Sequence, residues 1–209
     1  TTGEGPNHRL EATQTRFTLG AADPAGAIWQ IPLTYAPLAD LTQSRVELLG
    51  AAIATIPWPA GATAIKANVG DTGFYRVYYD EPLRVSLQAA IATLPAADQL
   101  NLLSDTWALV RAGRSTSPDL LTLAGRLNGS RNEAVWTNIL NAFKTLDGYQ
   151  QGQPGRRAFQ AWAVRQVTPL ARRLGWEPVP GESPLTGTLR ADLFELLGKK
   201  DIREPANWS

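Results

Sequence analysis

Apolar and polar residues alternate in short runs along the first 80 residues of the chain. In one run the apolar side chains of Trp29, Ile31, Leu33 and Tyr35 recur at every second position, so they share one face of a strand. Turns rich in Pro and Gly separate the runs. The predicted strands cover residues 13–19, 27–36, 44–49, 62–68 and 72–80. Short strands at this spacing predict a small antiparallel β-sandwich domain over residues 1–80.

After residue 80 the apolar positions recur every three to four residues, as they do on a helix with one buried face. Helix boundaries carry matching chemistry: Ser117-Pro118 pairs an N-cap with a first-turn proline, and Gly175 stands where a helix ends in a left-handed residue. Six helices are predicted, near residues 81–94, 97–112, 118–128, 131–146, 156–174 and 184–197. Helices of this length joined by short turns predict an all-α domain of helical hairpins, similar to an α-solenoid, over residues 81–209. The one long polar connection, residues 147–157, is predicted to be disordered.

The stretch KANVGDTGFYRVYYDE, residues 66–81, has the densest aromatic pattern of the chain. It predicts a last strand over residues 73–79, approached through Gly70 and Gly73, which are expected to adopt positive φ. The alternation places Phe74, Arg76 and Tyr78 on one face and Tyr75, Val77 and Tyr79 on the other. Neither face has a polar pattern, so both are expected to be covered. The arginine is expected to have a structural role, stacking on an aromatic ring and pairing with a carboxylate.

The composition narrows the classes of function. A chain of 209 residues accommodates one or two domains. It has no Cys and a single His, His8, which argues against disulfides and against a zinc site in this chain. A net charge of +1 argues against a nucleic-acid partner, and no apolar run approaches the roughly 20 residues of a membrane span. We therefore expect this chain to bind no cofactor and no nucleic acid and to have no membrane span.

Motifs for catalysis are also absent. The chain contains neither the glycine patterns that bind nucleotides nor the G-x-S-x-G motif of serine hydrolases. A Ser-His-Asp triad would have to use His8, near the chain end. The 19 acidic residues are scattered, so a hydrolase site assembled from distant carboxylates stays open as a minor alternative.

One helix carries five arginines with no acidic residue between them: Arg156, Arg157, Arg165, Arg172 and Arg173. Because guanidinium groups suit carboxylates, this set is a candidate surface for anions or for the carboxylate of a peptide. The favoured alternative is a solvated helix face, on which Arg172 and Arg173 also stabilise the helix C-terminus.

Several of these motifs occur in an order that resembles a known family. They are LEATQTRF (10–17), WQIPLTYA (29–36), the stretch 66–81, LNLLSDTWALVRAG (100–113) and LARRLGWEPVPGESPLTGTLR (170–190). The chain resembles the zinc aminopeptidase family of aminopeptidase N and puromycin-sensitive aminopeptidase from about residue 10 to residue 200. The segment Asn-x-Gly-x-x-Gly-[Phe/Tyr]-Tyr-Arg of that family corresponds to Asn68, Gly70, Gly73, Phe74, Tyr75 and Arg76, which form a candidate structural motif.

The resemblance implies a supporting role. The catalytic domain of this family binds zinc through H-E-x-x-H and a distal Glu, and it holds the substrate's amine through Gly-x-Met-x-Asn. A chain with one His and no Met can contain neither motif. The resemblance therefore implies the non-catalytic C-terminal portion of a parent enzyme, with a truncated helical domain. Zinc, the catalytic domain and the peptide substrate then belong to the parent, whose active site this portion supports and caps, and this chain alone is expected to be inert.

The sequence gives further expectations about the origin and the behaviour of the chain. The chain begins with Thr1 and lacks Met, as a piece of a longer protein would, and exposed interface residues are expected to cause self-association. Arg outnumbers Lys 16 to 4, which hints at a GC-rich bacterial genome. The chain is expected to be soluble, in the bacterial cytoplasm or periplasm, and its sequence does not distinguish these compartments. The alternative function is a stand-alone helical module that binds a peptide or a protein without a peptidase domain.

Overall fold

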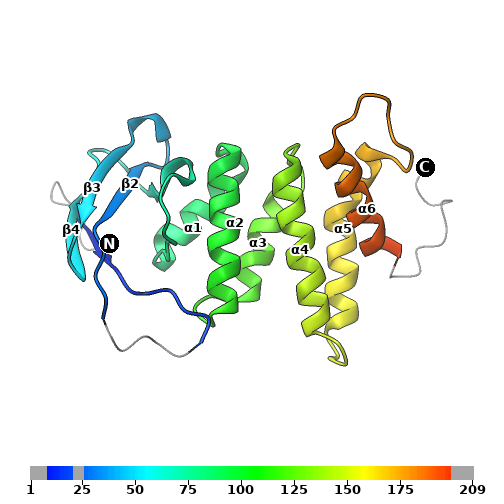
Figure 1. The fold of residues 1–209 in the computed structure, drawn as a ribbon, viewed down its shortest axis with the longest axis horizontal. Helices are drawn as coiled ribbons and strands as arrows, with labels where there is room; N and C mark the ends of the chain where they lie inside the picture. The colour runs from blue at the N-terminus through cyan, green and yellow to red at the C-terminus, as the bar shows by residue number, and fades with distance from the viewer. Residues whose placement is uncertain (1–8, 21–25, 199–209) are drawn as a thin grey trace. The chain divides into compact units, whose positions relative to one another are not determined.

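The computed structural model describes residues 9–20 and 26–198 (Figure 1). The chain divides into two compact units, residues 1–120 and 121–209. In chain order the described elements are strands followed by helices, so the predicted β-then-α fold class is confirmed. The finer sandwich and solenoid assignments and the domain boundary at residue 80 stay predictions.

The first unit contains two small antiparallel sheets. Their strands are β1 (Arg9–Thr13), β2 (Ile31–Pro37), β3 (Arg45–Leu49), β4 (Ile53–Pro57) and β5 (Ile65–Ala67). One sheet pairs β1 with β4, and Leu10 lies opposite Ile56. The other has β2 in the centre, where Tyr35 lies opposite Arg45 of β3 on one side and opposite Ala67 of β5 on the other.

One hydrophobic core receives side chains from both sheets. Leu33 and Tyr35 of β2, Ile56 of β4 and Ile65 of β5 are buried together, and Leu83 joins them from the first helix. Of the apolar residues that alternate at positions 29–35, Leu33 and Tyr35 point into this core, as expected for a strand with one buried face.

The helices of the first unit follow directly. They are α1 (Glu81–Ala90), α2 (Ala96–Arg111) and α3 (Ser117–Arg126), and α3 contains the boundary between the units. Short 3-10 turns lie at Leu41–Gln43, Val69–Asp71 and Ile91–Thr93. The Asp80 carboxylate caps α1 by accepting a hydrogen bond from the Leu83 N–H at 3.2 Å.

The second unit contains α4 (Glu133–Tyr149), α5 (Arg156–Leu174) and α6 (Pro184–Gly198), and α4 contacts both of the others. Its core is aromatic where α4 meets α5: the Phe143 ring lies 5.4 Å from that of Trp162 and 6.0 Å from that of Phe159, edge to face in both pairs. The observed bounds of all three helices lie close to the predicted ones.

Two predictions at strands and loops were wrong. β1 covers residues 9–13 in place of 13–19, because the chain turns away at Gln14, whose side-chain amide donates to the carbonyl oxygens of Leu49 and Ala51. The connection between α4 and α5 spans only residues 150–155 and is ordered, because Arg156 and Gln160 of α5 both donate to the Asp147 carboxylate. The sequence also missed β4, which is short and bounded by Ala and Pro.

The predicted strand over residues 73–79 was also wrong. Its side chains alternate between exposed and half-buried, but residues 73–75 form a bend and the segment joins no sheet ladder. Its backbone bonds to α2, where the Val77 N–H donates to the Asp105 carboxylate at 2.9 Å. Its tyrosine hydroxyls, and not its backbone, bond to the strands. An alternating pattern of side chains therefore does not by itself show that a segment is a strand, nor what its backbone bonds to.

Candidate functional site

The motif that begins at Asn68 forms a tight left-handed turn. Asn68, Gly70 and Asp71 have φ values of 52°, 68° and 56°. Asn and Asp tolerate this region better than other residues with a side chain, because their short polar groups bond locally. Gly70 thus adopts the predicted positive φ, whereas Gly73 does not. Gly73 is needed for space, since a Cβ at this position would overlap the Tyr75 ring.

The Asn68 side chain, which is fully buried, holds the end of this turn. Its oxygen accepts a hydrogen bond from the Gly73 N–H at 2.8 Å. Its amide nitrogen donates to the carbonyl oxygens of Gly73 and Tyr75 at 3.1 and 3.3 Å. One asparagine therefore fixes the path of the chain from the turn into the aromatic segment.

Lys66, on β5, lies directly beneath the turn and has no exposed surface. Its Nζ donates to the carbonyl oxygens of Ala67 and Asn68 at 2.6 and 3.1 Å and to Oδ1 of Asn101 at 2.7 Å. Oδ1 of Asp98 lies 3.4 Å from the same nitrogen. Burial lowers the pKa of Lys66, although the nearby carboxylates act in the opposite direction. The ammonium group is therefore fully coordinated inside the protein.

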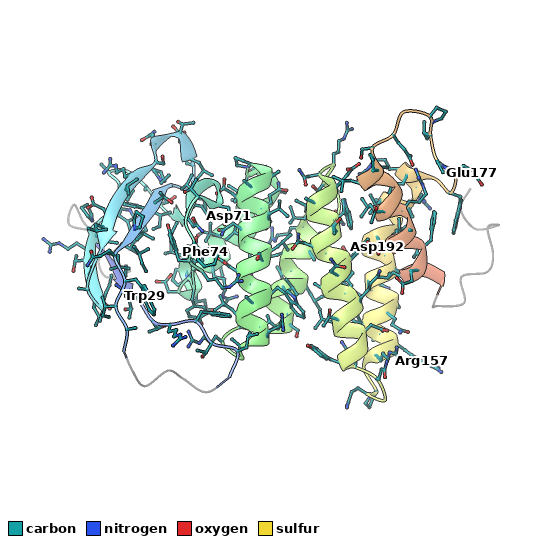
Figure 2. The ribbon with its side chains drawn as sticks, in the orientation of Figure 1. Trp29, Asp71, Phe74, Arg157, Glu177 and Asp192 are labelled. Atoms are coloured by element: carbon teal, nitrogen blue, oxygen red, sulfur yellow. The ribbon has the colours of Figure 1, made fainter. Side chains whose placement is uncertain are left out.

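Helix α2 provides the partners of the turn through Asp98, Asn101 and Asp105, which share one helix face and are all buried. Asp98 accepts from the Gly70 N–H at 2.9 Å, and the Asn101 amide donates to the Asp71 carboxylate at 2.9 Å. We call the buried residues Lys66, Asn68, Asp98, Asn101 and Asp105, together with the exposed Asp71 to which Asn101 donates, the Lys66 network. Figure 2 shows Asp71 and Phe74, which is three residues further along the chain, on the segment beside α2.

Two tyrosines join the aromatic segment to the sheet. The Tyr75 hydroxyl accepts from the Thr34 N–H of β2 at 3.0 Å. The Tyr79 hydroxyl accepts from the Ala67 N–H of β5 and donates to the Ala67 carbonyl oxygen, both at 3.1 Å. Burial raises the pKa of Tyr79 above its usual value. The Tyr79 phenol thus bonds both backbone groups of Ala67 on β5, an edge strand of its sheet.

Arg76 lies between an aromatic ring and a carboxylate. Its guanidinium carbon is 5.2 Å from the centre of the Phe17 ring, and its Nη1 lies 3.3 Å from Oδ1 of Asp105. The side chain is 39% exposed, whereas that of Asp105 is 6% exposed. Arg76 therefore connects the buried network to the surface.

Sequence reasoning found Asn68, Gly70, Gly73, Phe74, Tyr75 and Arg76 but missed their partners. A signal for those partners was present: Asp98, Asn101 and Asp105 recur at helical spacing, as residues on one helix face do. Lys66 is likewise the one charged residue in its predicted strand. Polar residues at positions where the periodicity of a helix and of a strand predicts buried side chains therefore indicate a buried polar network.

The five arginines of α5 do not form a single cluster. Arg156 binds the Asp147 carboxylate through Nη2 at 2.7 Å, and Arg173 donates to the Ser130 carbonyl oxygen at 2.9 Å. Burial and the nearby Arg131 lower the pKa of Arg173. Arg157, Arg165 and Arg172 are exposed, and their spacing places them on one side of the helix (Figure 2 labels Arg157). A common anion surface on the arginines of α5 stays a prediction.

The buried Arg190 organises the loop between α5 and α6. Both nitrogens at the end of the Arg190 side chain bind the Glu182 carboxylate, at 2.5 and 2.6 Å. The same side chain donates to the carbonyl oxygens of Leu174 and Gly175, which end α5. The hydrogen bonds from Arg190 lower the pKa of Glu182 to about 2. These contacts explain the Gly-Trp, Gly-Glu and Leu-Arg pairs in residues 170–190 as a helix cap and a loop closure.

The described residues contain neither a metal site nor a membrane span. No group of three or more His, Cys, Asp or Glu is placed there to hold a metal ion. None of the helices in the described ranges is long and apolar enough to cross a membrane. His8 lies outside the described residues.

The Asp105 carboxyl provides a test of the network by pH. Burial raises its pKa from 3.8 to about 6. Between those values the folded protein holds a proton that the unfolded chain releases, so the unfolding free energy falls as pH rises, by up to about 3 kcal/mol above pH 6. In Asp105→Asn, whose amide oxygen can still accept from Val77, we expect this loss to disappear. Urea unfolding at pH values from 4 to 8 measures the difference between the two proteins, and a difference that does not change with pH would contradict the assignment.

The chain is similar to one protein family and to several named proteins. Residues 64–207 match the family described as ERAP1-like C-terminal domain, and this range contains both the Lys66 network and Arg190. The chain is 30% identical to "Aminopeptidase M1-A" of Oryza sativa, over 91% of this chain and 23% of that protein. It is 30% identical to "Puromycin-sensitive aminopeptidase" of Caenorhabditis elegans, over 90% of this chain and 21% of the relative.

A bacterial relative shows the same coverage. "Aminopeptidase N" of Lactococcus lactis is 25% identical over 90% of this chain and 23% of its own length. The chain thus spans less than a quarter of the length of each of these relatives. Because the relatives come from a plant, an animal and a bacterium, they do not support the bacterial source that the composition hinted at.

Proposed function

Since the chain belongs to the family described as ERAP1-like C-terminal domain, we propose that it is the non-catalytic C-terminal portion of a zinc-dependent aminopeptidase. The parent would remove N-terminal residues from peptides, and this portion would support and cap its active site. The observation that carries the proposal is the coverage, because nearly the whole chain aligns with proteins called aminopeptidases while accounting for under a quarter of each.

The described residues do not fit a zinc site. The three carboxylates of the Lys66 network already accept hydrogen bonds or ion pairs: Asp98 from Gly70 and Lys66, Asp71 from Asn101, and Asp105 from Val77 and Arg76. No histidine belongs to the network. In this proposal zinc is bound by the catalytic domain of the parent, outside these 209 residues.

The Lys66 network suits a supporting role. It fixes α2 to the turn at Asn68 through buried charges and hydrogen bonds, so the sheet and the first helices of this unit resist relative movement. A body that caps an active site and limits which peptides enter needs this rigidity. The exposed Arg157, Arg165 and Arg172 of α5 stay candidates for binding the carboxylate of a peptide substrate.

The complete reading frame that contains this sequence tests the proposal. We expect it to encode an H-E-x-x-H motif upstream of Thr1, and its product to hydrolyse aminoacyl reporter amides with about one bound zinc per chain. Replacing the Glu of that motif with Gln should abolish turnover, and the 209-residue chain alone should show none. Zinc-dependent turnover by the pure 209-residue chain would overturn the proposal. Absence of the upstream motif would also overturn it, in favour of a stand-alone module that binds peptides or proteins.

A further inference from the structure

The face formed by Phe74, Arg76 and Tyr78, here called the 74–78 face, is exposed. The Phe74 side chain is fully exposed (110%) and that of Tyr78 is 64% exposed. The residues between and beside them behave differently, since Tyr75, Val77 and Tyr79 pack against the core of the first unit. The sequence predicted cover on both faces, and within the described residues only one face has it.

The backbone that carries the 74–78 face is fixed from within. Asn68 binds the carbonyl oxygens of Gly73 and Tyr75, and Asp105 binds the Val77 N–H. The aromatic side chains therefore project from a segment that has already lost its backbone freedom. Large aromatic side chains on a preorganised backbone are typical of the centres of protein interfaces, because little ordering remains to be done on binding.

Arg76 adds hydrogen-bond donors to the 74–78 face, which a partner would have to accept. Within the described residues its guanidinium donates only through Nη1, to Asp105 and to Ser104. The Nε and Nη2 donors remain for an acceptor from outside. A partner that suits the face therefore has an apolar surface for two aromatic rings and a carboxylate or carbonyl oxygen opposite the guanidinium group.

We propose that the 74–78 face is the surface on which the preceding part of the parent chain docks. This inference rests on the proposed function. The occupant is argued from length: each relative is more than four times as long as its aligned region, so a large body of protein accompanies this region in them. A face whose aromatics are held rigidly by the buried network is the part of the described surface best prepared to receive that body.

Hydroxyl-radical footprinting read by mass spectrometry tests the docking. The complete product of the reading frame is compared with the 209-residue chain at the same concentration. We expect Phe74 and Tyr78 to react rapidly in the 209-residue chain and, in the complete product, as slowly as Tyr35, which is fully buried. Tyr149, which is 66% exposed and lies in the other unit, is the matched control and should react alike in both proteins.

The outcomes separate this inference from the proposed function. Equal reactivity of Phe74 and Tyr78 in the two proteins would overturn the docking, while zinc-dependent turnover by the complete product would leave the proposed function standing. Protection in the 209-residue chain that grows with concentration would also overturn it, since the occupant would then be a second copy. A reading frame without a peptidase region would overturn both.

A variant gives an independent readout. Phe74→Ser should leave the Tm of the 209-residue chain unchanged, because the ring has full exposure there, and should lower the Tm of the complete product. Equal Tm values for the complete product with and without the substitution would count against the docking.

Discussion

Lys66→Met is expected to destabilise the first unit by about 3–5 kcal/mol, the usual cost of removing one partner from a buried ion pair. The thioether fills the volume of the lysine stem but donates no hydrogen bond. Asp98 then remains as a buried carboxylate without its cation, and the Ala67, Asn68 and Asn101 oxygens lose their donor. Because domains are stable by only about 5–15 kcal/mol, this change removes a large part of the total. Urea unfolding followed by far-UV circular dichroism measures it.

Two further variants identify the cause. Lys144→Met is the matched control, since Lys144 also pairs with acidic residues, Asp192 and Glu195, but at the surface, where such pairs contribute less than about 1 kcal/mol. Adding Asp98→Asn to Lys66→Met should restore part of the loss, because a neutral amide needs no counter-ion. A Lys66→Met protein within 1 kcal/mol of the unmodified chain would contradict the role assigned to the network.

The helices could be predicted from the sequence because their signals are local. A proline after Ser117 and glycines at helix ends fix boundaries through the backbone itself, and the apolar period identifies the buried face. The strands were harder. Residues 73–79 have a strand's alternation, yet their hydrogen bonds are made by Asp105 of α2 and by tyrosine hydroxyls, which no local pattern reveals.

The candidate site also contains residues that could be predicted from the sequence and residues that could not. Asn68 and Gly70 could be identified because a left-handed turn selects Asn and Gly within a few residues. Their partners on α2 lie about 30 residues away, and a polar residue on an apolar helix face does not say which charge it meets. The arginines of α5 are also close in sequence, yet Arg156 and Arg173 bind Asp147 and Ser130, partners that the helix pattern does not reveal.

The network also has a cost, which bears on its role. Burial lowers the pKa of Lys66 and raises that of Asp105 to about 6, so both charged groups are destabilised by desolvation. Apolar side chains of similar volume would often be as stable or more so. What buried polar groups provide is a unique arrangement, and we infer that the network is retained to hold the turn, the aromatic segment and α2 in one geometry.

Asn68→Ala is expected to destabilise the first unit by about 3 kcal/mol, from two separate sources. Alanine in a left-handed conformation costs about 1 kcal/mol, because its Cβ crowds the following carbonyl oxygen and no side-chain bond compensates. The three lost hydrogen bonds with Gly73 and Tyr75 account for the remaining 2 kcal/mol or so, at roughly 0.7 kcal/mol each. Chemical denaturation gives the total.

Asn68→Gly separates those sources, because glycine also lacks the hydrogen bonds but adopts positive φ without strain. We expect it to be about 1 kcal/mol more stable than Asn68→Ala and still clearly less stable than the unmodified chain. Asn138→Ala on the exposed side of α4 is the matched control and should change stability by no more than about 0.5 kcal/mol. If glycine restored full stability, only the backbone conformation of residue 68 would matter, and the side-chain bonds that direct the aromatic segment would have no energetic role.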